Sequence, residues 1–138
     1  MLPPGMYLQT QNAENKEPHL PCCLRKNPTK REWQHWIVSN IPGSNIHQGT
    51  TLCEYIGAGP PKGSGLHRYV FLLFKQPQGK IELKEEKRLS NRTGQGRGGW
   101  SARAFARKYG LGDPIAANWY EAEWDHSVDK LYERLSGK

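Results

Sequence analysis

A run of glycines and prolines that leads directly into an apolar segment is the strongest constraint on how this chain folds. Residues 57–69 hold four glycines and two prolines, and residues 70–74 (VFLLF) are wholly apolar. Glycine leaves backbone N–H groups accessible, and proline fixes the course of a loop without needing a hydrogen bond to its nitrogen. The pattern predicts a shaped loop that enters a buried β-strand.

The side chains at this junction predict a polar pocket. Strand side chains alternate, so His67, Tyr69 and Phe71 share one face and Arg68 and Val70 share the other. Imidazole N–H, phenol O–H and main-chain N–H groups are donors suited to an anion. A histidine near its ordinary pKa can also gain a proton as the anion arrives. The junction therefore indicates the rim of a small anion site.

The other periodic segments predict a mainly β chain that ends in helices. Residues 33–41 (WQHWIVSNI) are apolar on both faces, with Trp33, His35 and Ile37 on one of them, which favours a central strand covered on both sides. We also expect a short strand over 51–56, a strand over 70–75, a buried strand over 114–124, a helix from Ser101 to Tyr109 that ends at Gly110, and a last helix after Asp125 with the apolar stripe Val128, Leu131, Tyr132 and Leu135.

The length of 138 residues favours one domain, preceded by a segment of different character. Residues 1–24 contain four prolines and no hydrophobic period, so we expect an irregular, disordered segment there. The folded domain is predicted to span residues 25–138. Within it, the polar and glycine-rich residues 80–99 predict a long exposed loop.

The net charge of +7 is distributed unevenly along the chain. Residues 80–108 hold nine basic and three acidic side chains, which is typical of a solvated surface but also suits a nucleic-acid surface. Aromatic side chains that could stack on bases are sparse there, and Phe105 and Tyr109 are better placed in the core of a helix. We therefore expect no nucleic-acid partner, and nucleic-acid binding stays an alternative.

Cysteine content and motifs exclude several other classes. Three cysteines, two of them adjacent, form no disulfide framework, which favours a reducing compartment. His19, Cys22 and Cys23 fit no standard zinc spacing, so no metal is expected. No apolar run reaches the ~18 residues of a membrane span, and the N-terminus lacks the pattern of a signal peptide, which predicts the cytoplasm. No nucleotide fingerprint, G-x-S-x-G or H-E-x-x-H motif is present, so we expect neither an enzyme nor a cofactor.

Three segments resemble the phosphatidylethanolamine-binding protein family, whose animal members are also called Raf kinase inhibitor proteins. They are residues 31–36 (REWQHW), residues 57–69 (GAGPPKGSGLHRY), and residues 122–125 (AEWD) followed by Leu131 and Tyr132. The resemblance extends over residues 25–138. It implies a β-sandwich of two sheets with Greek-key connections and C-terminal helices.

The resemblance also implies a function without catalysis. Family members have a small pocket that accepts phosphate or the phosphorylated headgroup of a lipid, here lined by Trp33, His35, Gly57, Gly59, Pro61, His67, Tyr69 and Tyr132. His35 and His67 would donate to the phosphate, Gly59 would offer its N–H, and Tyr132 would close the mouth. Family members bind protein kinases, and some inhibit serine proteases. Peripheral contact with a membrane is compatible with such a ligand.

One departure from the family pattern affects the pocket. Family members carry an aspartate- and proline-rich motif, D-P-D-A-P-S-R, immediately before the segment that begins here at Arg25. In this chain residues 21–24 are Pro-Cys-Cys-Leu. The resemblance therefore implies a truncated or variant member that lacks the family's N-terminal strands and the carboxylates of the pocket. A form that folds poorly or binds weakly is an alternative to a working binding protein.

Overall fold

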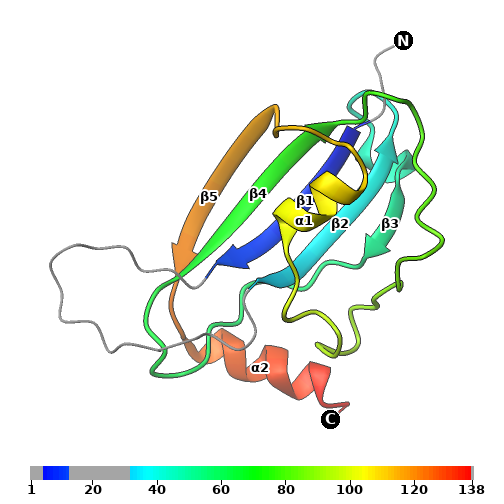
Figure 1. Cartoon of the computed structure of the whole chain (residues 1–138). Helices are drawn as coiled ribbons and strands as arrows, with labels where there is room; N and C mark the ends of the chain where they lie inside the picture. Colours follow the sequence, from blue (N-terminus) through cyan, green and yellow to red (C-terminus); the bar gives the residue numbers. More distant parts are fainter. Residues whose placement is uncertain (1–4, 13–31, 138) are drawn as a thin grey trace, which may run out of the picture.

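The computed structural model describes residues 5–12 and 32–137, which form one antiparallel sheet and two α-helices (Figure 1). The elements in chain order are β1 (Gly5–Asn12), β2 (Trp33–Ile41), the short 3-10 helix η1 (Ile46–Gln48), β3 (Thr50–Cys53), β4 (His67–Lys75), α1 (Ala102–Lys108), β5 (Ala116–Ala122) and α2 (His126–Leu135). The described part of the chain is therefore mainly β, as predicted.

The sheet has five strands in the order β3-β2-β1-β4-β5, so β1 is its central strand. It pairs antiparallel with β2 on one side and with β4 on the other, where the register runs from Gly5 opposite Lys75 to Asn12 opposite Arg68. The expectation of little order across residues 1–24 is thus wrong for Gly5–Asn12. The segment forms a strand because β2 and β4 offer it main-chain hydrogen-bond partners on both sides. Its own residues carry no pattern that predicts this pairing. The other residues of 1–24, and the predicted boundary at residue 25, lie outside the described residues.

Strand β2 is the central, mostly buried strand that its two apolar faces predicted, and it lies between β3 and β1. Strand β4 begins at His67, earlier than the apolar run suggested, because its first residues pair with β5 at His67–Ala122. Strand β3 is shorter than predicted and ends at Cys53.

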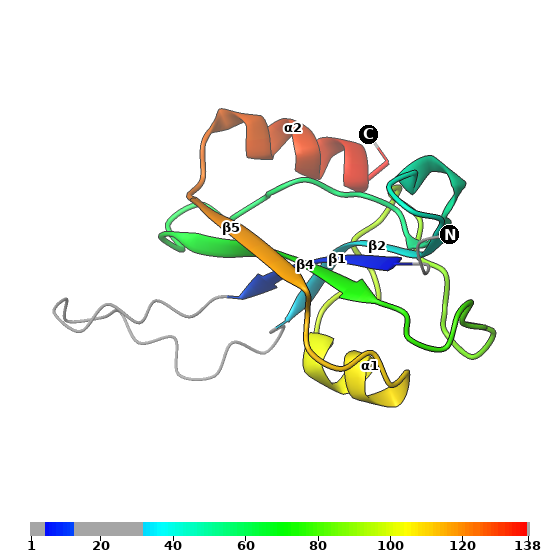
Figure 2. The same ribbon diagram turned by 90° about the horizontal axis from the view of Figure 1, so that it is seen from above.

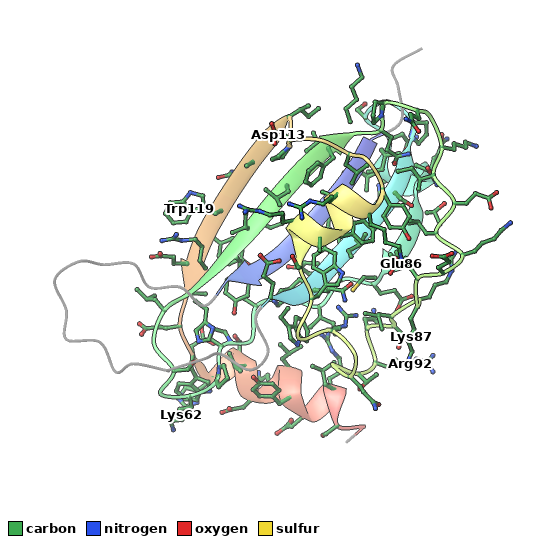
Figure 3. The ribbon with its side chains drawn as sticks, in the orientation of Figure 1. Lys62, Glu86, Lys87, Arg92, Asp113 and Trp119 are labelled. Carbon is green, nitrogen blue, oxygen red and sulfur yellow. The ribbon has the colours of Figure 1, made fainter. Side chains whose placement is uncertain are left out.

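The last strand, β5, differs from the prediction in its environment. We expected residues 114–124 to form a buried strand, but β5 is an edge strand that pairs only with β4, and most of its side chains are exposed. Its alanines need little burial, and the indole of Trp119 is covered on one face by the guanidinium of Arg68, 4.7 Å from the ring centre. Figure 3 shows Trp119 on the outer side of this edge.

Both helices begin at the caps expected from the sequence. The Ser101 hydroxyl accepts the N–H of Ala104 at the start of α1, and the Asp125 carboxylate accepts the N–H of Ser127 at the start of α2. Gly110 follows α1 with φ of 61°, a conformation that favours glycine. The two helices lie on opposite sides of the sheet (Figure 2). No helix of the described residues is long and apolar enough to span a membrane.

The apolar core lies between the sheet and α1. Its buried members include Ile37, Phe74 and Phe105, with Leu72 partly buried against them. The loop over residues 80–99 completes this layer and is less exposed than predicted, because Leu89 and Arg97 are buried. Within the described residues the strands form a single sheet, with α1 and this loop as the second layer, and not the two sheets of a sandwich.

Candidate anion-binding site

A β-bulge in β2 gives His35 its orientation. Trp36 lies opposite Gln9 and Gln34 lies opposite Thr10, so the register between β2 and β1 skips His35. A bulge inserts one unpaired residue and redirects its side chain. The expectation that His35 and Ile37 share a face therefore fails. Ile37 packs in the α1 core, whereas the imidazole of His35 contacts the ring of Tyr69 at a centroid distance of 5.1 Å.

Burial favours the neutral form of the His35 imidazole at neutral pH. Its Nδ1–H donates to the carbonyl of Ile56 over 2.7 Å, since a carbonyl can only accept. Burial lowers the pKa of His35 to about 4, which outweighs the opposing effect of that hydrogen bond, and the nearby Arg97 lowers the pKa further. The expectation of a histidine near its ordinary pKa therefore does not hold here, and Nε2 is an acceptor at neutral pH.

His67 is oriented by its own loop. The Ser64 hydroxyl donates to the carbonyl of Pro61 over 2.6 Å. A hydroxyl has one proton, so Ser64 accepts the second hydrogen bond from Nε2–H of His67, also over 2.6 Å. The sequence reasoning missed Ser64. Its position between two glycines of the loop, three residues before His67, was the available signal.

Tyr69 is the most deeply buried polar side chain of the cluster. It has no exposed surface, and its ring stacks on Tyr120 at a centroid distance of 5.1 Å. Its hydroxyl is buried without a hydrogen-bond partner among the described residues. Burial raises the pKa of Tyr69 well above its ordinary value, and the main-chain N–H of Gly59, which lies near the hydroxyl oxygen without meeting hydrogen-bond geometry, partly opposes that shift. A buried donor without a partner costs about 1–3 kcal/mol.

Helix α2 closes the cluster against the loop that contains Gly59. The Tyr132 hydroxyl donates to the Gly59 carbonyl over 2.7 Å. A Cβ atom at Gly59 would lie 2.7 Å from Cδ2 of Leu131, so glycine lets α2 approach the loop closely. At Gly57 the added atom would meet Tyr55 at an ordinary 3.6 Å, so the same argument does not apply there.

The structure brings most of the predicted site residues together. The rings of Trp33 and His35 lie 4.4 Å apart, and His67 precedes Tyr69 by two positions on one face of β4. Because Leu72 and Phe74 face α1, alternation places Tyr69 on the opposite face, on the side of the sheet where α2 lies (Figure 2). Pro61 is exposed, and Gly57 lies at the outer margin of the cluster.

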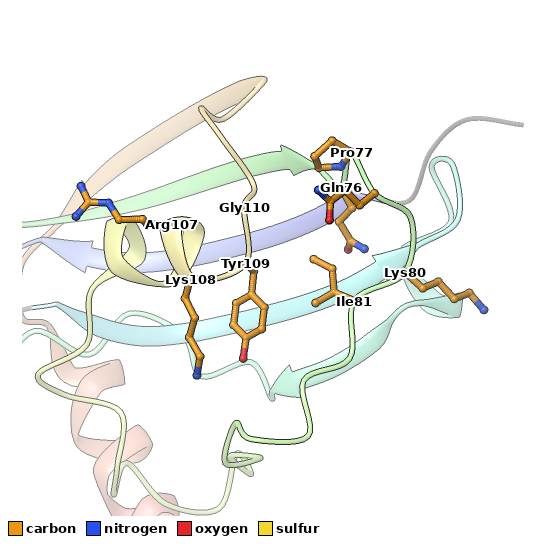
Figure 4. A pocket seen from close by; sticks show the side chains of 9 residues that line it. Gln76, Pro77, Lys80, Ile81, Arg107, Lys108, Tyr109 and Gly110 are labelled. Carbon is orange, nitrogen blue, oxygen red and sulfur yellow. The ribbon is translucent and has the colours of Figure 1, made fainter.

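Two open hollows lie outside this cluster. One, of about 590 Å³, borders Gly57 and is lined by Tyr55, Gly57, Ala58, Asn91, Ser127, Lys130, Leu131 and Arg134. The other, of about 480 Å³, lies between the end of β4 and the end of α1 (Figure 4). Its cations Lys80 and Arg107 point away from its centre in that view, and Lys108 is paired with Glu86 at 2.6 Å. This second hollow is therefore a poor anion site.

Metal binding finds no basis in the described residues, which contain no group of three histidine, cysteine or acidic side chains that could hold an ion. His19, Cys22 and Cys23 lie outside the described residues. The only cysteine within them, Cys53, is buried, and burial raises its pKa to about 11, so it is an unreactive thiol.

An antiparallel sheet with a buried polar cluster on one face, closed by a C-terminal helix, defines a small β-rich domain with a candidate ligand site. The chain belongs to the phosphatidylethanolamine-binding protein family, whose model matches residues 16–121. The resemblance inferred from the sequence is thereby confirmed. The match begins at residue 16, before residue 25, where we expected the resemblance to begin.

Individual relatives agree with this assignment. The chain is 37% identical over 113 residues to "Putative odorant-binding protein A5" of Drosophila melanogaster. The aligned residues make up 82% of this chain and 53% of the relative. It is 41% identical to the protein of "CG7054 solution structure", with a TM-score of 0.71 over 98% of this chain and 70% of that one. It is 28% identical to a chain of "Crystal structure of carboxypeptidase Y inhibitor complexed with the cognate proteinase", with a TM-score of 0.62 over 88% of this chain and 60% of that one. The chain thus spans about half the length of the curated relative it matches.

Proposed function

We propose that this protein binds the phosphate group of a ligand in the cluster formed by His35, His67 and Tyr69. The ligand is a phospholipid headgroup such as phosphoethanolamine or a phosphorylated protein segment. The observation that carries the proposal is the Tyr69 hydroxyl, a fully buried donor without a partner among the described residues. Such groups are rare in folded proteins and require an explanation, which a bound anion would supply.

The state of His35 predicts how the anion binds. Its Nδ1–H is bonded to Ile56, so the neutral ring offers Nε2 only as an acceptor. A phosphate dianion therefore needs a proton between its oxygen and Nε2, whereas a monoanion brings one. We expect binding near neutral pH to take up a proton and to raise the pKa of His35, because a nearby negative charge favours the imidazolium.

The test is a titration with inorganic phosphate, and separately with O-phosphoethanolamine, followed by NMR of the histidine rings. His35 and His67 should shift together with one saturating curve. The exposed His47 and His126 provide a control within the same chain and should not follow that curve. Shifts equal to those of the controls at millimolar ligand would reject the proposal. A response to O-phosphoethanolamine alone would assign the site to the lipid headgroup.

Inhibition of a protease is a second candidate function. It is supported by the similarity to the carboxypeptidase Y inhibitor, a protein solved in complex with its proteinase. The purified chain should slow peptide hydrolysis by a serine carboxypeptidase at micromolar concentration. Unchanged hydrolysis at a large excess of the chain would remove this candidate. Binding to protein kinases rests on family membership, and a pull-down with purified kinase domains tests it.

Three finer points complete the proposal. The sheet corresponds to the C-terminal part of a two-sheet family fold, in keeping with the 60% of the inhibitor chain that is matched. Affinity is lower than in members that carry the aspartate- and proline-rich motif. The role is binding and not catalysis, and it is exercised in the cytoplasm.

The nucleic-acid alternative is weakened by the basic stretch itself. Arg97 is fully buried, Lys84 pairs with Glu82 at 2.7 Å, and Lys108 pairs with Glu86. The remaining cations form a less continuous surface than the sequence suggested. A gel shift with single-stranded RNA should show no complex at 150 mM salt, and a stable complex there would revive this alternative.

A further inference from the structure

Arg97 is a buried cation held by main-chain carbonyls. Its side chain has no exposed surface. Nη1 donates to the carbonyls of Gln34 and His35 over 3.1 and 3.2 Å, and Nη2 donates to those of Glu54 and Ser90 over 2.7 and 2.8 Å. Four of its five N–H groups can thus be accounted for, while Nε is buried without a partner among the described residues.

Arg97 forms no ion pair with a carboxylate of the described residues, although the charge of Glu54 acts on it. The carboxylate of Glu54, the acidic residue nearest in sequence to its bonded carbonyls, instead accepts the N–H of Asn91 over 2.8 Å. Burial lowers the pKa of Arg97 and the negative charge of Glu54 partly opposes that shift, and an arginine side chain stays protonated in proteins. Buried charges are normally paired, because taking an ion out of water is costly. Carbonyl dipoles reduce that cost without cancelling the charge.

The position of Arg97 links it to the candidate anion site. Two of its bonds fix the carbonyls of Gln34 and His35, the residues at the bulge of β2. Its guanidinium lies 5.3 Å from the ring centre of Trp33, and that ring contacts the imidazole of His35. Arg97 lowers the pKa of His35, as expected if the electric field of its positive charge reaches the candidate site.

We propose that Arg97 is the fixed counter-charge of the bound anion, in addition to holding the bulge that presents His35. This inference rests on the proposed function. The guanidinium supplies positive charge beside Trp33 and His35, and the ligand's phosphate supplies a negative charge in addition to that of Glu54. Arg97 is a positioning residue, since it acts through the field at His35 and through the main chain.

A purely structural role makes different predictions, and two variants separate the roles. Arg97→Lys keeps the charge but cannot reach four carbonyls. Arg97→Met removes both the charge and the hydrogen bonds. Arg103→Met is the matched control, since Arg103 is exposed on α1 and no ion pair is found for it among the described residues.

The experiment measures the dissociation constant of inorganic phosphate by NMR at low salt, at a temperature where circular dichroism shows each variant folded. We expect Arg97→Met to weaken binding by roughly tenfold. This is the effect of removing one unit charge that attracts the phosphate across a partly screened distance. It should also raise the pKa of His35. Arg97→Lys should retain most of the affinity, and Arg103→Met all of it.

Several outcomes would overturn the proposal. Equal losses in the Lys and Met variants would assign Arg97 a structural role only, and so would an unchanged affinity in Arg97→Met. If Arg97→Met does not fold, Arg97→Lys decides alone, because a large loss of affinity in the folded lysine variant contradicts a charge role. If the wild-type protein binds no phosphate, the proposed function fails. The pKa of His35 in the variants then still tests whether the field of Arg97 reaches that ring.

Discussion

The two faces of the sheet bury different kinds of side chain, and the α1 side includes side chains from the helix itself. On the α1 face, Ile37, Phe74 and Phe105 are apolar and at most 5% exposed. On the α2 face, His35, His67 and Tyr69 are polar and at most 8% exposed. The first face gains free energy from burial, whereas the second buries polar groups, among them the Tyr69 hydroxyl, which has no hydrogen-bond partner among the described residues. Together with the proposed function, the difference predicts that the first face contributes most of the stability and the second binds the ligand.

Loss of a core aromatic should break the stability of the chain and leave its site chemistry intact. Phe105 packs between Trp100 and Tyr109 with centroid distances of 5.4 and 4.8 Å. We expect Phe105→Ala to lower the free energy of unfolding by about 3–5 kcal/mol in urea denaturation. The matched control, Arg103→Ala on the exposed side of α1, should change little. If folded Phe105→Ala lost phosphate binding, the division between the faces would be wrong.

Acidification should destabilise the polar face through His35. Its pKa is about 4 in the folded state and about 6.5 in the unfolded chain, so the unfolded chain takes up the proton first as pH falls. The stabilising contribution of neutral His35 is present above pH 6.5 and is lost between pH 6.5 and about 4, on the order of 3 kcal/mol.

Urea denaturation of the wild type and of His35→Gln measures this loss. The free energy of unfolding of the wild type should fall relative to that of His35→Gln on acidification through that range. A difference that stays constant with pH would show that His35 is not held neutral by burial. Phosphate should reduce the loss, because it favours the protonated ring.

A substitution at Gly59 should push α2 away from the glycine-rich loop and so change both the stability and the candidate site. Gly59→Ala adds a methyl group that meets Leu131, and we expect a cost of about 1–3 kcal/mol together with weaker phosphate binding. Gly57→Ala is the control, since its added atom has ordinary contacts. Thermal unfolding and the phosphate titration report the two effects. Equal behaviour of the two alanine variants would contradict a close approach of α2 at Gly59.

The smallest expected effect belongs to the hydroxyl that closes the cluster. Tyr132→Phe removes one hydrogen bond to the Gly59 carbonyl, which is worth about 0.5–1.5 kcal/mol. We expect a slightly lower melting temperature and faster exchange of bound phosphate in NMR line shapes. A slower exchange would show that Tyr132 does not close the site.

The sequence predicted the elements whose signals are local. Ser101 and Asp125 marked the starts of both helices, and the two apolar faces of residues 33–41 marked an interior strand. The glycine-rich loop identified His67 and Tyr69 as neighbours. Alternation also predicted that His67 and Tyr69 share one face of their strand. The structure agrees, because Leu72 and Phe74 pack in the α1 core on the opposite face.

Features that depend on distant partners could not be predicted in this way. Strand β1 is defined by pairing with β2 and β4, and its own residues carry no strong strand pattern. The bulge at His35 follows from that pairing and reverses the expected face. The burial of Arg97 depends on carbonyls up to 63 positions away in the chain, so the sequence pattern assigned it to an exposed loop.

The most direct test of the account is the affinity of Tyr69→Phe for O-phosphoethanolamine, measured by calorimetry beside the wild type. The variant keeps the ring that stacks on Tyr120 and removes only the buried hydroxyl. We expect binding to weaken by about tenfold or more, while the free energy of unfolding without ligand stays the same or rises, because a donor without a partner is gone. An unchanged affinity, or a lower free energy of unfolding in the variant without ligand, would contradict the claim that this hydroxyl is held in place for an anion.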